Sequence, residues 1–153
     1  MTDRQPLEAL LIDPNPEDVR LFLEALENEK ITNSINIVST GAKALDFLHQ
    51  RGEYTDAVRP NLILMDIELP QMDGQELLEE LNGDPELMHI PVIVLTGSDK
   101  AEDIVQSYDL HVNAYVQKPV EPDTFLDVVR SLEGFWLEVV RSPPEYEEED
   151  DLL

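Results

Sequence analysis

The sequence contains no cysteine, so disulfide bonds and thiolate metal sites are excluded. Long apolar runs are missing too, because unbroken stretches such as residues 62–65 are far too short to span a bilayer. The polar start at residues 1–4 does not have the pattern of a signal peptide. These absences predict a cytoplasmic protein without membrane segments.

Basic residues are scarce: Lys and Arg number 10 against 34 Asp and Glu, which gives a formal net charge of −24. Phosphate backbones and anionic membranes are bound by clustered Lys and Arg. We therefore expect no binding to nucleic acid or to a membrane surface. So acidic a composition is typical of halophilic proteins, in which salt screens the repulsion between like charges. An ordinary acidic cytosolic protein is the alternative.

The length of 153 residues suits one domain with a single core. Regular patterning continues to about residue 141, where Ser142, Pro143 and Pro144 interrupt it. The residues beyond are rich in acids, a composition typical of disordered segments. We expect one domain over residues 1–141 and an acidic, disordered tail over residues 142–153.

Apolar runs suited to strands alternate with amphipathic segments suited to helices. The strands are expected at residues 7–12, 35–38, 62–65, 92–95 and 114–116. The helices are expected from Asn15 as N-cap with Pro16 in the first turn, at residues 42–50, 75–81 and 101–110, and from 122 toward 140. This alternation predicts an α/β fold with a doubly wound, five-stranded parallel sheet and helices on both faces.

Three polar residues end separate strands of the expected sheet: Asp66, Thr96 and Lys118. Parallel strands end at the same edge, so their side chains should converge there. A carboxylate can attack a phosphoryl group only where the incoming negative charge is neutralised. Lys118 would supply positive charge and Thr96 a hydrogen bond, while Gly97 would leave room for the group. The three residues predict a site that forms an acyl phosphate and responds to its presence.

The chain to about residue 141 resembles the response-regulator receiver domains of two-component signalling. The matches are Asp66 within residues 64–74 for the phosphoacceptor segment, Thr96 for the switch hydroxyl, Lys118 with Pro119 for the lysine–proline pair, and Tyr115 for the rotating aromatic. Any one of these is common by itself, but all of them in order at the family spacing are specific. The resemblance implies a flavodoxin-like receiver fold and phosphorylation of Asp66 by a histidine kinase.

The resemblance also implies a switch. Once Asp66 carries a phosphoryl group, Thr96 would move toward it and Tyr115 would turn inward. The face made by the fourth helix, the fifth strand and the fifth helix would then change, and a downstream protein target would bind it. A Tyr115 that stays fixed with its hydroxyl at the surface is the alternative.

One position departs from the family pattern. Receiver domains usually carry two adjacent acids after the first strand, and the second acid binds the metal ion directly. Here Asp13 takes the first place and Pro14 the second, and proline has no side-chain oxygen. Mg²⁺ tolerates several waters in its shell, so Asp13, Asp66 and Glu68 are the expected ligands of a weakened site. The alternative is a pseudo-receiver that binds partners without phosphorylation.

The last expected helix has more apolar residues than one sheet face can cover. The interface residues expected on it are Phe125, Val129, Leu132, Phe135 and Trp136. Residues 107–110 and 131–137 resemble single-domain regulators that work with phytochrome-type histidine kinases, and the resemblance implies a homodimer through this region. A broad core helix covered by its own loops is the alternative.

A phosphohydrolase of the haloacid dehalogenase type also places Asp, Thr and Lys at strand ends. Its nucleophile normally lies on an early strand in an Asp-x-Asp pair, whereas here the pair is Asp66 and Glu68 after the third strand. The pattern therefore favours signalling, and we expect no turnover of a separate substrate.

Overall fold

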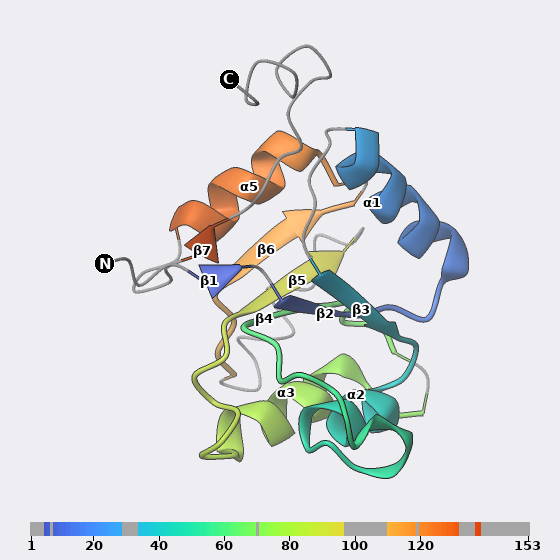
Figure 1. Ribbon diagram of the computed structural model, residues 1–153, viewed down its shortest axis with the longest axis vertical. Coiled ribbons are helices and arrows are strands. Elements are labelled where there is room, and N and C mark those ends of the chain that lie inside the picture. The colour runs from blue at the N-terminus through green and yellow to red at the C-terminus, as the bar shows by residue number, and fades with distance from the viewer. Residues whose placement is uncertain are drawn as a thin grey trace, which may run out of the picture.

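The computed structural model describes residues 5–6, 8–28, 34–69, 71–96, 110–118, 120–131 and 137–138 (Figure 1). Its central sheet is made of β2 (Glu8–Ile12), β3 (Ser34–Val38), β4 (Leu62–Met65), β5 (Val92–Thr96) and β6 (Ala114–Gln117). All neighbouring strands are parallel, in the order β3-β2-β4-β5-β6. Since each parallel pair needs a crossover, the helices fall on the faces of the sheet. The α/β prediction is confirmed.

Helices α1 (Pro16–Asn28) and α5 (Pro122–Ser131) cover one face of the sheet, and α2 (Gly41–Leu48) and α3 (Gly74–Gly83) cover the other (Figure 1). A short 3₁₀ helix, η1 (Gly52–Tyr54), follows α2. The helix expected at residues 101–110 lies outside the described residues, apart from Leu110. None of the helices within the described ranges is long and apolar enough to cross a membrane.

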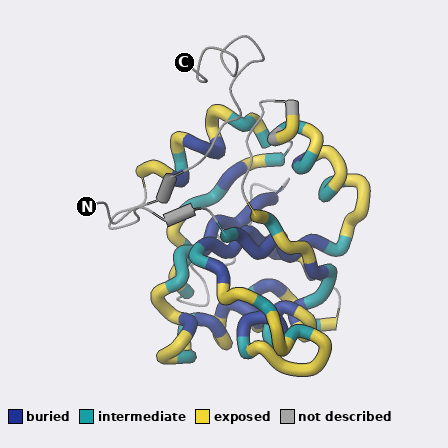
Figure 2. The backbone as a smooth tube through the Cα atoms, viewed as in Figure 1, coloured by how far each residue is buried: buried dark blue, intermediate teal, exposed yellow. Residues whose placement is uncertain are grey.

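The central strands are buried on both faces, because side chains alternate along each strand. In β2, Ala9 and Leu11 pack on the side of α1 and α5, whereas Leu10 and Ile12 pack on the side of α2 and α3. Figure 2 shows this buried centre with exposed helix surfaces around it. Full burial of one such leucine stabilises the fold by about 1.5–3 kcal/mol, so the strands form a rigid platform for the residues that follow them.

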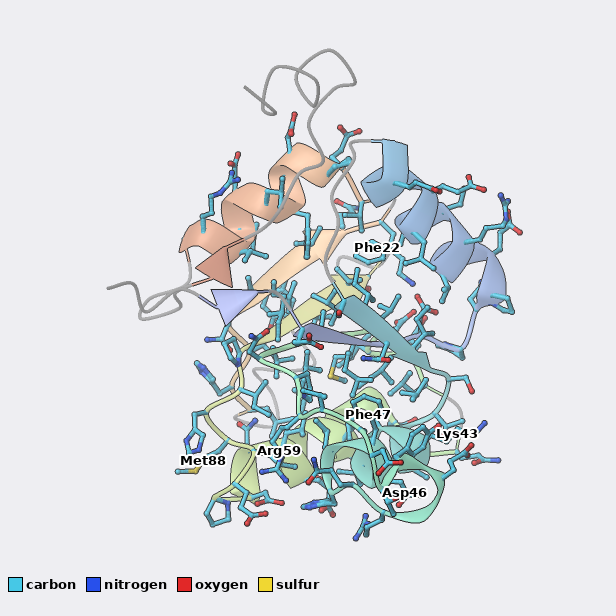
Figure 3. The ribbon with its side chains drawn as sticks, viewed as in Figure 1. Phe22, Lys43, Asp46, Phe47, Arg59 and Met88 are labelled. Atoms are coloured by element: carbon cyan, nitrogen blue, oxygen red, sulfur yellow. The ribbon has the colours of Figure 1, made fainter. Side chains whose placement is uncertain are left out.

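Aromatic residues anchor the helices on both faces. The ring of Phe22 in α1 lies 5.7 Å from that of Phe125 in α5, edge to face. On the other side, the ring of Phe47 in α2 lies 5.4 Å from that of Tyr54. Figure 3 labels Phe22 and Phe47 above and below the sheet. The contact between Phe22 and Phe125 holds α1 against α5, and α1 starts next to the carboxyl edge of the sheet.

The start of α1 follows the expected capping pattern. Asn15 Oδ1 accepts hydrogen bonds from the backbone N–H groups of Glu17 at 2.9 Å and of Asp18 at 3.3 Å. Pro16 is the first helical residue. The first turn is therefore held in place, and Asp18 is fixed within it.

The prediction for the last helix is wrong at residues 137–138. The sequence predicts a helix from 122 toward 140, but Leu137–Glu138 forms a strand, β7, that pairs in parallel with β1 (Gln5–Pro6). α5 runs from Pro122 to Ser131. At 137–138 a tertiary backbone pairing outweighs local helix propensity, which is a weak determinant.

Two of the residues expected at an interface are buried in the core instead. Phe125 and Val129 are 0% and 1% exposed and belong to the core between α5 and the sheet. Side chains already buried within their own chain have no surface left for a partner, so their assignment to an interface is wrong. Leu132, Phe135 and Trp136 lie outside the described residues.

Candidate functional site

Asp66 stands directly after β4 at the carboxyl edge of the sheet. Its backbone N–H donates to Ile12 O at 3.0 Å, and its Oδ1 accepts from the backbone N–H of Glu68 at 2.9 Å. These bonds fix both the backbone and the orientation of the carboxylate. Its second oxygen, Oδ2, accepts a hydrogen bond from Lys118 Nζ at 3.0 Å.

Asp13 stands after β2, beside Asp66. Its backbone N–H donates to Val38 O at 3.1 Å, and its Oδ1 accepts from the backbone N–H of Asn15 at 2.9 Å. The residue is only 4% exposed. A buried carboxylate requires a cationic or hydrogen-bonding partner, and Asp13 has one in Lys118.

Lys118 follows β6 and connects the cluster. Its Nζ donates to Asp13 Oδ2 at 2.7 Å, to Asp18 Oδ2 at 3.0 Å and to Asp66 Oδ2 at 3.0 Å. Burial alone would lower the pKa of the ammonium, but these three hydrogen bonds outweigh burial and hold the pKa above its ordinary value. The ammonium group therefore stays charged at neutral pH.

Thr96 is the last residue of β5 and is 7% exposed. Its carbonyl oxygen accepts from the backbone N–H of Lys118 at 3.0 Å, so the ends of β5 and β6 are joined at this edge. Tyr115 in β6 is half-buried and packs against the core beneath α2 and α3. Gly97 lies outside the described residues.

Three carboxylates meet at this edge. One oxygen each from Asp13, Asp18 and Asp66 lies within 4.8 Å of the other two. Hard oxygen donors at this spacing fit a divalent ion such as Mg²⁺. Glu68, the third ligand expected from the sequence, is exposed and is not part of this group. Its backbone N–H contacts Asp66, while its carboxylate is not among the clustered oxygens.

Asp18 was not anticipated as a site residue. An acid in the first turn of a helix is already explained by the helix dipole, so its presence carries no separate signal. The clue available in the sequence is its distance of five residues from Asp13, which becomes meaningful only once the turn into α1 is known.

The charges define what the site can do. Three carboxylates around one ammonium leave an excess of negative charge that attracts a divalent cation. Asp66 offers a carboxylate oxygen as nucleophile, and Lys118 offers a positive charge next to it. This combination suits transfer of a phosphoryl group to Asp66.

Comparisons with known proteins agree with this geometry. A model of the response regulator receiver domain matches residues 9–130. Response regulator Rcp1 of Synechocystis sp. is 42% identical over 138 residues, which cover 90% of this chain and 94% of Rcp1. A solved Mn²⁺-bound form of Rcp1 has a TM-score of 0.68 to this structure and covers 91% of this chain and 100% of its own.

Two further solved structures are similar. The bacteriophytochrome response regulator AtBRR has a TM-score of 0.78 and 40% identity, covering 86% of this chain and 96% of its own. The phosphorylated cyanobacterial phytochrome response regulator RcpA has a TM-score of 0.69 and 42% identity, covering 86% and 94%. With the receiver fold and an acidic cluster around Lys118 at its carboxyl edge, this chain belongs to the response-regulator receiver family.

Proposed function

We propose that this protein is a single-domain response regulator that accepts a phosphoryl group from a histidine kinase onto Asp66. The observation that supports this most directly is the 3.0 Å contact between Lys118 Nζ and Asp66 Oδ2. It pairs the nucleophile with the cation that phosphoryl transfer requires. A structure of a similar regulator, RcpA, is described as phosphorylated.

In the proposed step, a carboxylate oxygen of Asp66 attacks phosphorus and forms a P–O bond. The bond between phosphorus and the imidazole nitrogen of the donor breaks, and that nitrogen takes up one proton as it leaves. Lys118 would neutralise one phosphoryl oxygen, and Thr96 would donate a hydrogen bond to another. Water later hydrolyses the acyl phosphate, so the protein acts on itself and turns over no separate substrate.

Mg²⁺ is the proposed cofactor, held by Asp13 and Asp66. When bound, it would offset charge on the phosphoryl oxygens. The Mn²⁺-bound form of Rcp1 supports divalent-ion binding in a similar protein. Pro14 is expected to weaken the site, because no side-chain oxygen stands at that position.

The signal would leave through the face of β6 and α5. Tyr115 lies on β6, two residues before the strand ends, and a change of its position on phosphorylation would alter that face. A downstream protein target in the cytoplasm would bind there. We further propose a homodimer through the region of Leu132, Phe135 and Trp136, and a kinase of the phytochrome type, as the names of AtBRR and RcpA suggest for those proteins.

Intact-protein mass spectrometry tests the function. The protein is incubated with acetyl phosphate and Mg²⁺, beside Asp66→Asn as the control. A single phosphoryl adduct on the wild type, absent from the variant, supports the proposal. No adduct at any Mg²⁺ or salt concentration contradicts it.

The second candidate is a pseudo-receiver that binds partners without phosphorylation. Pro14 favours it, because the family's usual metal ligand is missing there. The same experiment separates the two, since a pseudo-receiver takes up no phosphoryl group.

A further inference from the structure

Asp18 lies in the phosphorylation site, although the phosphotransfer step proposed above does not use it. It belongs to the first turn of α1, and its Oδ2 lies 3.0 Å from Lys118 Nζ. Its oxygen is within 4.8 Å of oxygens of both Asp13 and Asp66. Asp18 thus completes a set of three carboxylates in a chain whose expected second acid is replaced by Pro14.

The fold places Asp18 there by local structure. Pro14 leads the chain from β2 directly into α1, and Asn15 caps the helix by accepting from the N–H of Asp18 at 3.3 Å. The side chain of Asp18 is 34% exposed, against 3% for Asp13 and 16% for Asp66. Asp18 is therefore the most accessible of the three carboxylates, and an ion entering from solvent would meet it early.

We propose that Asp18 supplies the metal-binding carboxylate that Pro14 removes, so that Asp13, Asp18 and Asp66 together hold the divalent ion. This rests on the proposed function and names the ligand set of its metal site. One ligand of the metal ion would then come from α1 instead of from the loop after β2. The affinity for Mg²⁺ then depends on a helix residue that the family pattern does not assign to the metal.

A purely structural role for Asp18 predicts the opposite result. If Asp18 only anchors Lys118, its removal frees the ammonium from one partner and weakens the competition between Lys118 and the ion. Metal affinity would then stay the same or increase. If Asp18 is a ligand, exchange of its carboxylate for an amide lowers the affinity, because the negative charge is lost and an amide oxygen binds a divalent ion more weakly than a carboxylate oxygen does.

Binding of Mn²⁺ to the unphosphorylated protein provides the measurement, since Mn²⁺ accepts the same oxygen ligands and its free-ion paramagnetic resonance signal disappears on binding. The test variant is Asp18→Asn, which is nearly isosteric. The matched control is Glu27→Gln, which removes one charge from an exposed position of the same helix, about 13 Å further along its axis. Circular dichroism checks that each variant is folded.

We expect Asp18→Asn to raise the dissociation constant about tenfold or more, and Glu27→Gln to change it less than about twofold, because exposed distant charges are screened. The double variant Pro14→Asp with Asp18→Asn should recover most of the affinity, since an acid returns to the usual place. Unchanged or tighter binding by Asp18→Asn overturns the inference, and so does an equal loss in Glu27→Gln.

The phosphorylation assay tests the proposed function independently of the Mn²⁺-binding measurement. If wild type binds Mn²⁺ through Asp18 but Asp66 takes up no phosphoryl group, the proposed function fails and the ligand assignment stands. If Asp66 is phosphorylated and Asp18→Asn leaves Mn²⁺ binding unchanged, the ligand assignment fails and the function stands.

Discussion

Lys118 Nζ lies 2.7 Å from Asp13 Oδ2, although the two residues are 105 positions apart in the sequence. The Asp13 side chain is 3% exposed and that of Lys118 is 15% exposed, so water screens the pair weakly. A nearly buried carboxylate without a cation is costly, because its desolvation is no longer offset. This pair ties the end of β6 to the end of β2.

Replacing Lys118 with Met should lower the free energy of unfolding by about 3 kcal/mol, because three carboxylates lose their shared cation. Adding Mg²⁺ should restore part of the loss, since a divalent ion then neutralises the same oxygens. Urea unfolding with and without Mg²⁺ measures both effects. A stability equal to that of the wild type would show that the three carboxylates do not depend on Lys118 for their stability in the folded state.

The contribution of Lys118 should depend on pH in one direction. Its pKa in the folded state is raised above the ordinary lysine value of 10.5 that applies in the unfolded chain. The stabilisation is therefore fully present below that unfolded value and is lost as the pH rises through the folded pKa. The difference in unfolding free energy between wild type and Lys118→Met should stay constant from about pH 7 to about pH 9 and shrink in more alkaline solution. A difference that already falls across neutral pH contradicts this.

Gly74→Ala should destabilise the protein by about 1–3 kcal/mol. A Cβ at Gly74 would lie 2.4 Å from the carbonyl oxygen of Ile67, a backbone atom that cannot move without shifting the loop after Asp66. Gly74 also donates to this oxygen at 3.0 Å. Equilibrium unfolding in guanidinium measures the loss.

Gly83→Ala is the control in the same helix. A Cβ there meets nothing within 4 Å, so the variant should be as stable as the wild type or gain about 0.5 kcal/mol from the higher helix propensity of alanine. If both variants lose the same stability, the close contact at Gly74 does not explain its effect.

Salt should stabilise this protein. The formal net charge of −24 produces self-repulsion in the folded state, and added ions screen it. We expect the midpoint of thermal unfolding to rise steadily with KCl, and to rise similarly with NaCl. A midpoint that is flat or falls with salt contradicts the halophilic interpretation of the composition and favours an ordinary acidic protein.

The proposed dimer depends on residues after α5. Trp136→Ala should shift the mass measured by light scattering from dimer toward monomer, because a large apolar side chain would be lost from the interface. Met88→Ala is the control: Met88 is 57% exposed and lies outside the proposed interface, so this variant should leave the mass unchanged. Equal masses for wild type and Trp136→Ala would remove the proposal.

The sequence predicted the sheet and the meeting of Asp66 with Lys118 for a simple reason. Parallel strands end at one edge, so polar residues placed after buried runs must lie near one another. The capping of α1 by Asn15 was predictable as well, because it depends on local geometry alone.

Other features depend on tertiary contacts that periodicity does not report. Leu137–Glu138 is a strand because it pairs with Gln5–Pro6, which lies far away in the sequence. Asp18 joins Asp13 and Asp66 only because α1 starts immediately beside the sheet edge. An acid in a first helical turn is too ordinary to indicate such a contact in advance.

The most direct test of phosphorylation at Asp66 locates the modified residue. The protein is treated with acetyl phosphate and Mg²⁺ and then with borohydride, which reduces an acyl phosphate of aspartate to homoserine, and the peptides are sequenced by mass spectrometry. We expect homoserine at position 66 alone, and none there in Lys118→Met or without Mg²⁺. Intact Asp66 in treated wild-type protein, or homoserine at another aspartate, would contradict it.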